Sequence, residues 1–201
     1  NSHMLLFYNI NLIYQGNTLN IYMKLENHLG GHCNVTHIDI NAIQLLKDKY
    51  NIKTMYDLGC GPGGMVIAAQ HAGINCVGID GDYTLKYPIG VNVILHDFTK
   101  GKPDVEPRDA CWSCEFLEHV EEKYLDNIFE VFKKCSVVFC TASMAPGGHH
   151  HVNLKDCDYW ISQFTNRGFT YNKDMTAQLR SKSSMHRDFV RDTGMVFEYT
   201  I

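Results

Sequence analysis

Two clusters of side chains in this sequence together supply carboxylates and imidazoles. Glu115, Glu118 and His119 form the pattern E-x-x-E-H, so on one helical turn the three side chains can point the same way. A run of three histidines follows later in the chain, and in an extended loop its outer members, His149 and His151, would face one side. Carboxylate oxygens and imidazole nitrogens suit Mg²⁺ or Mn²⁺, and a histidine can also act as a general base.

These clusters support two hypotheses about one site. In the first, a divalent metal ion is held by Glu115, Glu118, His119 and His151. In the second, no metal is needed and the proton of an acceptor is removed by a catalytic histidine, with His149, His151 and His119 as the candidates. The alternative for the histidine run is a polar surface loop without chemistry.

A third chemical feature is the glycine-rich stretch 57–64, which reads Asp-Leu-Gly-Cys-Gly-Pro-Gly-Gly. Its glycines allow a tight turn and a close approach of the backbone to a ligand. The carboxylate of Asp57 directly before them suits a ligand that carries a cation, and the glycine spacing departs from the pyrophosphate-binding pattern. The stretch therefore predicts an adenosine ligand with a positively charged amino-acid tail. Asp80 and Asp97 end the next two predicted strands and are placed to meet a ribose and an adenine ring.

These features need a scaffold that brings them together. Apolar runs predict short strands at 54–58, 75–79, 91–95, 110–114, 136–141, 169–171 and 195–199, the last two as a hairpin. Helical periodicity predicts helices at 39–50, 65–71, 121–134 and 156–167. Strands that alternate with helices form right-handed crossovers and a mostly parallel sheet, whose carboxyl ends bind ligands. All three features follow predicted strands, so we expect them to converge.

The glycine stretch and the two later aspartates resemble the motifs of class I S-adenosylmethionine-dependent methyltransferases. That family has an acidic residue followed by G-x-G-x-G, matched by Asp57, Gly59, Gly61 and Gly63, and acidic residues at the ends of the next two strands. The resemblance implies an α/β, Rossmann-like, seven-stranded and mostly parallel sheet with helices on both faces and an antiparallel last strand. It implies S-adenosyl-L-methionine as cofactor, bound by Asp57, Gly59, Cys60, Gly61, Gly63, Asp80, Gly81, Asp97, Phe98 and Glu115.

Two narrower resemblances concern the acceptor. The E-x-x-E-H pattern with a later histidine is similar to the metal site of small-RNA 2′-O-methyltransferases, where a divalent ion chelates the vicinal hydroxyls of a terminal ribose. The pattern His151-Val152-Asn153 followed by Tyr159-Trp160-Ile161 resembles small methyltransferase domains found with glycan-building enzymes. The second implies O-methylation of a sugar hydroxyl of a glycan, and fusion to or association with glycosyltransferase domains. The alternatives are an RNA 2′-O-methyltransferase and a non-catalytic cofactor-binding scaffold.

Composition narrows the class of protein. The chain has 201 residues, of which 45% are apolar and 20% charged, which predicts a single globular domain over 5–201 or one module of a longer protein. The net charge of −4 argues against a nucleic-acid partner, because proteins that bind nucleic acids are usually basic. No apolar run is long enough to cross a membrane, and we expect a cytoplasmic protein. Residues 178–191 carry four basic side chains, which predicts a flexible cap over the acceptor or a solvated loop.

Two further predictions concern the cysteines and the N-terminus. Most of the eight cysteines lie in apolar runs, which indicates reduced thiols of the core. The pair Cys111 and Cys114 has no second pair at zinc spacing, so a zinc or redox site is unfavoured. Residues 1–4, Asn-Ser-His-Met, look like a cloning scar.

Overall fold

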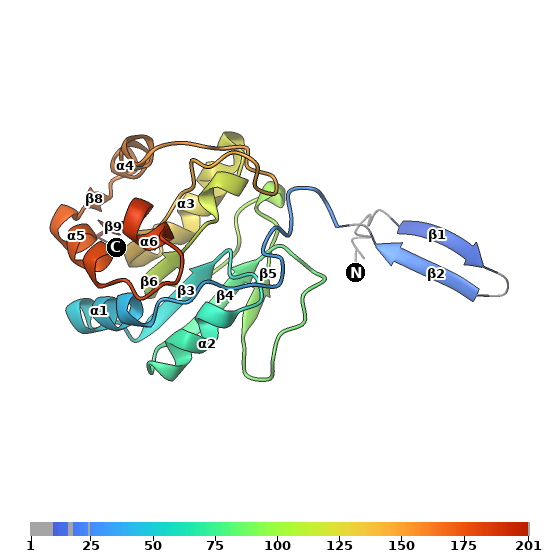
Figure 1. Ribbon diagram of the computed structural model, residues 1–201, viewed down its shortest axis with the longest axis horizontal. Helices are drawn as coiled ribbons and strands as arrows, with labels where there is room; N and C mark the ends of the chain where they lie inside the picture. Colours follow the sequence, from blue (N-terminus) through green and yellow to red (C-terminus); the bar gives the residue numbers. More distant parts are fainter. Residues whose placement is uncertain (1–9, 16–17, 24, 201) are drawn as a thin grey trace.

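The computed structural model describes residues 10–15, 18–23 and 25–200 (Figure 1), so the predicted scar lies outside the described residues. Near the N-terminus, β1 (Ile10–Gln15) and β2 (Thr18–Met23) pair antiparallel. Figure 1 shows this hairpin, in blue, projecting away from the rest of the chain. This hairpin was not predicted from the sequence.

Seven strands form the central sheet, in the spatial order β5–β4–β3–β6–β7–β9–β8. Their bounds are β3 (Thr54–Leu58), β4 (Asn75–Asp80), β5 (Val93–Leu95), β6 (Arg108–Ser113), β7 (Cys135–Cys140), β8 (Thr170–Tyr171) and β9 (Met195–Glu198). The first five pair parallel, and β9 runs antiparallel to both of its neighbours. The predicted sheet is therefore confirmed, including its antiparallel last strand.

Helices cover both faces of this sheet because successive side chains of a buried strand point to opposite sides. On one face, Met55 of β3 packs with α1 (Ile40–Tyr50), α2 (Gly64–His71), α5 (Lys173–Lys182) and α6 (Phe189–Thr193). On the other face, Tyr56 packs with α3 (Leu125–Phe132) and α4 (Cys157–Thr165). Short 3₁₀ helices lie at η1 (Phe98–Lys100), η2 (Leu117–His119) and η3 (Glu122–Tyr124).

The prediction for the basic segment 178–191 is wrong. Most of it lies in α5 and α6, whose inner side chains Met175, Leu179 and Val190 are buried in the core. Arg180 donates to the carbonyl oxygen of Gly194 at 2.8 Å, so this cation is occupied within the fold. The two helices also separate β8 from β9, which pair antiparallel but are not a hairpin.

The cysteines agree with the prediction of reduced core thiols. All eight lie within the described residues and are free, and five of them are buried. Burial raises the pKa of the Cys111 and Cys114 thiols, which disfavours the thiolates that zinc or redox chemistry requires. Among the described residues, no helix has the length and apolarity needed to cross a membrane.

Candidate functional site

A cavity of about 500 Å³ lies at the carboxyl ends of the parallel strands. Its lining comes from the residues that follow β3, β4, β5, β6 and β7, together with residues 28–32 of the N-terminal segment. The order of the strands reverses between β3 and β6, which is where α/β sheets bind ligands. All of the predicted site residues except Gly63 line this one cavity, so the predicted convergence is observed.

The glycine loop joins β3 to α2 in a conformation that needs its glycines. Gly59, Gly61 and Gly63 have φ of +74°, +48° and +81°, values that other residues rarely adopt. A Cβ at Gly59 would also stand 2.4 Å from the ring of Phe116. The backbone can therefore approach a ligand closely at this turn, and Gly63, although outside the lining, serves as the N-cap of α2.

Asp57, next to the last residue of β3, is a buried carboxylate with one oxygen that has no partner among the described residues. The residue is only 3% exposed, and its Oδ2 atom accepts no hydrogen bond from the described part of the chain. Burial, followed by the nearby charge of Asp80, raises the pKa of Asp57 to about 8. An orphaned buried carboxylate is stabilised by a cation. Asp57 thus fits the ammonium group of the predicted cofactor.

Asp80 ends β4 and organises the loops around it. Its Oδ2 accepts from the Gly61 amide at 2.7 Å, and its Oδ1 accepts from the Asp82 amide at 2.8 Å. Two residues after β5, Asp97 caps η1 by accepting from the Thr99 amide, and the ring of the next residue, Phe98, is buried. These positions fit the predicted contacts with a ribose and an adenine ring.

Glu118, His119 and His151 come together at the acceptor side of the cavity. One possible ligand atom from each lies within 4.8 Å of the other two, and we call this set the Glu118–His119–His151 group. The Nδ1 atom of His119 donates to the carbonyl oxygen of His149 at 2.7 Å, and that of His151 donates to the carbonyl oxygen of Ala145 at 2.8 Å. In each ring the proton is thereby fixed on Nδ1, and Nε2 keeps its lone pair.

The electrostatics of this group favour a bound cation. Glu118 is fully buried, and neither carboxylate oxygen accepts a hydrogen bond within the described residues. Burial and the neighbouring Glu115 raise the pKa of Glu118 to about 8, and burial lowers the pKa of His119 to about 4. A neutral imidazole whose other nitrogen is hydrogen-bonded to a backbone oxygen is the usual form of a metal ligand. The group thus fits a divalent ion.

Glu115 lies beside Glu118 but is not among the three residues whose possible ligand atoms converge. Glu115 precedes η2 with φ of +53°, and its Oε1 accepts from the Thr141 hydroxyl at 2.9 Å. The same hydroxyl accepts from the Glu115 amide at 2.8 Å, so Thr141, the residue after β7, holds both the amide and the carboxylate of Glu115. The predicted helical turn therefore contains Glu118 and His119 but not Glu115.

The histidine loop, residues 145–151, is a turn and not the extended loop that we predicted. Gly147 and His150 have φ of +93° and +47°, so the chain reverses between them. Two of its imidazoles have different surroundings: His149 contacts Leu29 through Nε2 at 2.9 Å, and His151 lies against His119 with ring centroids 4.8 Å apart. The hydrogen bond to Leu29 places the proton of His149 on Nε2. His151 is the better candidate for a base because it, and not His149, belongs to the Glu118–His119–His151 group.

Residues 28–32 and Thr141 belong to the site but were not predicted from the sequence. The pair Gly30 and Gly31, with φ of +84° and +94°, was the available signal, because adjacent glycines mark a sharp turn or a close contact. His28 and His32 flank this pair and line the cavity. Nothing in the local sequence states what they contact.

Comparisons with known proteins bear on the fold. The sequence matches no family profile and no curated protein. Among solved structures, the methyltransferase domain of bacterial CtHen1-C has a TM-score of 0.56 at 15% identity, covering 81% of this chain and 97% of its own. The plantazolicin methyltransferase BpumL in complex with SAH has a TM-score of 0.55 at 11% identity, covering 80% and 83%. A putative RNA methyltransferase from Pyrococcus horikoshii has a TM-score of 0.51 at 14% identity, covering 80% and 82%.

These likenesses agree with the strand order and with the glycine loop after the first parallel strand. The sequence identities, 11–15%, are too low for a comparison of substrates, so these structures bear on the fold alone. This chain has the Rossmann-like fold of the S-adenosylmethionine-dependent methyltransferases.

Proposed function

We propose that this protein transfers a methyl group from S-adenosylmethionine to a sugar hydroxyl. The observation that carries the proposal is a single cavity lined both by the orphaned carboxylate of Asp57, with Asp80 beyond it, and by the Glu118–His119–His151 group. Asp57 and Asp80 suit a ligand in which an amino acid is joined to a ribose. The Glu118–His119–His151 group suits the activation of a hydroxyl.

The roles of the residues follow from their surroundings. Asp57 pairs with the ammonium group, Asp80 accepts from the ribose hydroxyls, and Asp97 with Phe98 frames the adenine. In the absence of a metal ion, His151 takes the acceptor proton through Nε2, because its Nδ1 proton is engaged by Ala145. In the alternative with a metal ion, the Glu118–His119–His151 group would hold it, and the ion would lower the pKa of a bound hydroxyl and orient a vicinal diol. In-line displacement then depends on the positions in which these residues hold the two substrates.

The charge of the cavity supports a neutral acceptor. Among the described residues that line it there are carboxylates and imidazoles but no lysine or arginine. A phosphate-bearing acceptor is normally met by such cations. A glycan hydroxyl needs none, so we place a sugar first among acceptors. The link to glycosyltransferase domains stays a prediction.

A methylation assay with a panel of sugars and glycans tests this function. We expect methyl transfer to at least one acceptor with a vicinal diol, loss of that transfer in EDTA, and recovery with Mn²⁺ or Mg²⁺. Activity that persists unchanged in EDTA would remove the metal from the proposal and leave His151 as the base. Binding of S-adenosylhomocysteine (SAH) without turnover on any acceptor would favour a scaffold domain instead.

A second candidate is 2′-O-methylation of an RNA end. It is favoured by the likeness to the bacterial Hen1 domain and to the putative RNA methyltransferase, although both show the fold alone. A short RNA with an intact terminal diol belongs in the same panel, beside one whose terminal diol has been oxidised. Methylation of the first alone, with an affinity that falls steeply with salt, would place RNA before glycans.

The raised pKa of Asp57 predicts a pH dependence of cofactor binding. Below a pH of about 8 the free protein holds a proton on Asp57, whereas pairing with the ammonium group requires the carboxylate. Binding therefore releases a proton, and the affinity for SAH should rise with pH by up to about tenfold per unit until about pH 8. Calorimetry in buffers of different ionisation enthalpy measures this proton. Asp57→Asn should bind weakly at every pH, and an equally steep profile in that variant would contradict the assignment.

A further inference from the structure

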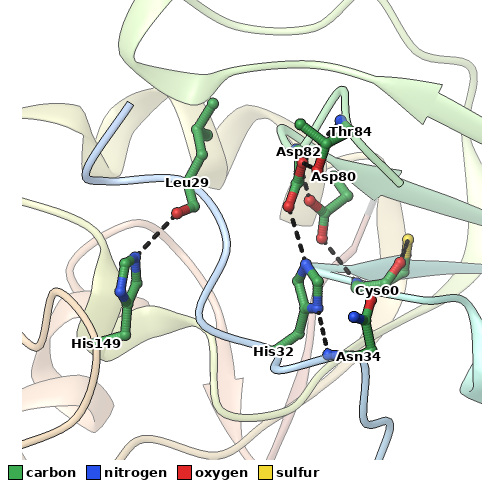
Figure 2. A network of polar contacts seen from close by, with 9 residues as sticks. Leu29, His32, Asn34, Cys60, Asp80, Asp82, Thr84 and His149 are labelled. Atoms are coloured by element: carbon green, nitrogen blue, oxygen red, sulfur yellow. Dashed lines mark hydrogen bonds and ion pairs between the residues drawn. The ribbon is translucent and has the colours of Figure 1, made fainter. Parts of the chain in front are cut away.

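Residues 28–32, which we call the strap, are fastened to the cofactor side of the cavity at two points. His32 donates from Nε2 to Oδ2 of Asp82 at 3.0 Å, and its Nδ1 accepts from the Asn34 amide, which fixes the tautomer (Figure 2). His28 contacts Oδ2 of Asp97 through Nε2 at 3.1 Å. The carboxylate of Asp82 is 3% exposed, so water competes little for this contact.

Asp82 in turn belongs to the network that holds the proposed ribose carboxylate. Its amide donates to Asp80 at 2.8 Å, and Asp80 accepts from Gly61 in the glycine loop. The side chain of His32 also packs on that loop, since a Cβ at Gly61 would stand 3.1 Å from the Cβ of His32. The strap therefore lies against both loops that would surround a bound nucleoside.

On its other side the strap holds the histidine loop. The carbonyl oxygen of Leu29 accepts from Nε2 of His149 at 2.9 Å, as Figure 2 shows. Gly31 lies under the same ring: a Cβ there would come within 3.1 Å of Cδ2 of His149. The carbonyl oxygen of His149 accepts from His119 at 2.7 Å, so hydrogen bonds run from Asp80 through the strap to the Glu118–His119–His151 group.

We propose that the strap couples the two halves of the site: a ligand bound at Asp80 fixes the strap, and the strap fixes the histidine loop and the imidazole of His119. His28 and His32 are positioning residues, and Gly31 is the point at which the strap contacts the histidine loop. The cofactor thus prepares the acceptor side before the acceptor arrives. This inference rests on the proposed function only for the identity of the ligand at Asp80.

Hydrogen–deuterium exchange of residues 145–152, with and without SAH, tests the coupling. In the wild type we expect SAH to slow exchange in this segment by about tenfold, a usual size for coupling between two sites. Gly31→Ala should reduce that protection to less than about twofold, because the new methyl group strains the φ of +94° and displaces His149.

Gly90→Ala is the matched control. Gly90 has a φ of +91°, so alanine causes the same backbone strain, but a Cβ there meets nothing within 4 Å. This variant should keep the full SAH-dependent protection. Equal protection in Gly31→Ala and Gly90→Ala would overturn the proposal, as would a wild type whose histidine loop ignores bound SAH.

The cofactor side is tested with His32. His32→Ala should weaken SAH binding by about tenfold and uncouple the histidine loop, and His32→Gln, which keeps a donor toward Asp82, should restore much of both. His71→Ala, an exposed histidine of α2 outside the cavity, should change neither. An SAH affinity that His32→Ala leaves unchanged would refute the role of His32.

These outcomes can be told apart from failure of the proposed function. The exchange measurement needs neither an acceptor nor a metal, so an inactive protein with intact coupling would refute only the methyl transfer. If calorimetry shows that SAH does not bind, the ligand-free arm decides: Gly31→Ala should exchange residues 145–152 faster than Gly90→Ala. Identical rates there would overturn the strap as a support of the histidine loop.

Discussion

Asp80→Ala is expected to weaken the binding of SAH by at least about 100-fold, the largest effect of any single change on the cofactor side. In the free protein the carboxylate already accepts hydrogen bonds from Gly61 at 2.7 Å and from Asp82 at 2.8 Å. Alanine removes the acceptor for both loops and the proposed acceptor for the ribose hydroxyls. A hydrogen bond to a charged group contributes about 1.5–3 kcal/mol, so the combined loss reaches the stated factor.

The fold should survive this substitution. Asp80 is the last residue of β4, and the core residues Cys76 and Ile79 of that strand remain packed. Calorimetry with SAH gives the affinity, and thermal unfolding by circular dichroism checks the fold. The affinity of Asp80→Asn for SAH should lie between those of the wild type and Asp80→Ala, because asparagine keeps one acceptor oxygen. The matched control is Asp104→Ala, an exposed aspartate outside the cavity. Tight binding of SAH by Asp80→Ala would refute the ribose assignment.

The parts of the fold that local sequence specifies were predictable. The strand β3 and the glycine loop after it carry their own signals, because a short apolar run is followed by residues that tolerate positive φ. The helices α5 and α6 carry a weaker signal. In α5 only Met175 and Leu179 among the apolar side chains are deeply buried, and polar residues dominate the rest. Asn172, which caps α5 by accepting from the Met175 amide, was a usable sign of its start.

The candidate site divides in the same way. Its residues could be predicted because each follows a parallel strand, and parallel strands end at one edge. Their contacts could not, because these depend on partners far away in the sequence. Thr141 holds Glu115 from the residue after β7, and Leu29 holds His149 from the N-terminal part of the chain. Only the packed sheet brings such pairs into contact.

Glu118→Gln is expected to reduce metal-dependent methyl transfer by at least about 100-fold with little change in stability. Loss of a direct ligand should exceed the roughly 10–100-fold cost of losing a group that only supports one. Glutamine has the shape of glutamate. Neither oxygen of Glu118 accepts a hydrogen bond from the described residues, so the substitution removes none. Titration with Mn²⁺ followed by electron paramagnetic resonance, together with the melting temperature, separates loss of metal binding from loss of fold.

Glu115→Gln is the informative comparison, because the E-x-x-E-H pattern alone makes the two glutamates equivalent. The structure does not: Glu115 is held by Thr141, whereas Glu118 lies with His119 and His151. We therefore expect the Glu115→Gln variant to keep most of the Mn²⁺ affinity and to lose mainly affinity for SAH. Glu115 lines the cavity and is followed in the chain by Phe116, whose ring packs on Gly59 of the glycine loop. Equal losses of Mn²⁺ affinity in both variants would show that Glu115 leaves Thr141 and joins the metal. Unchanged Mn²⁺ affinity in Glu118→Gln would remove the metal from the Glu118–His119–His151 group altogether.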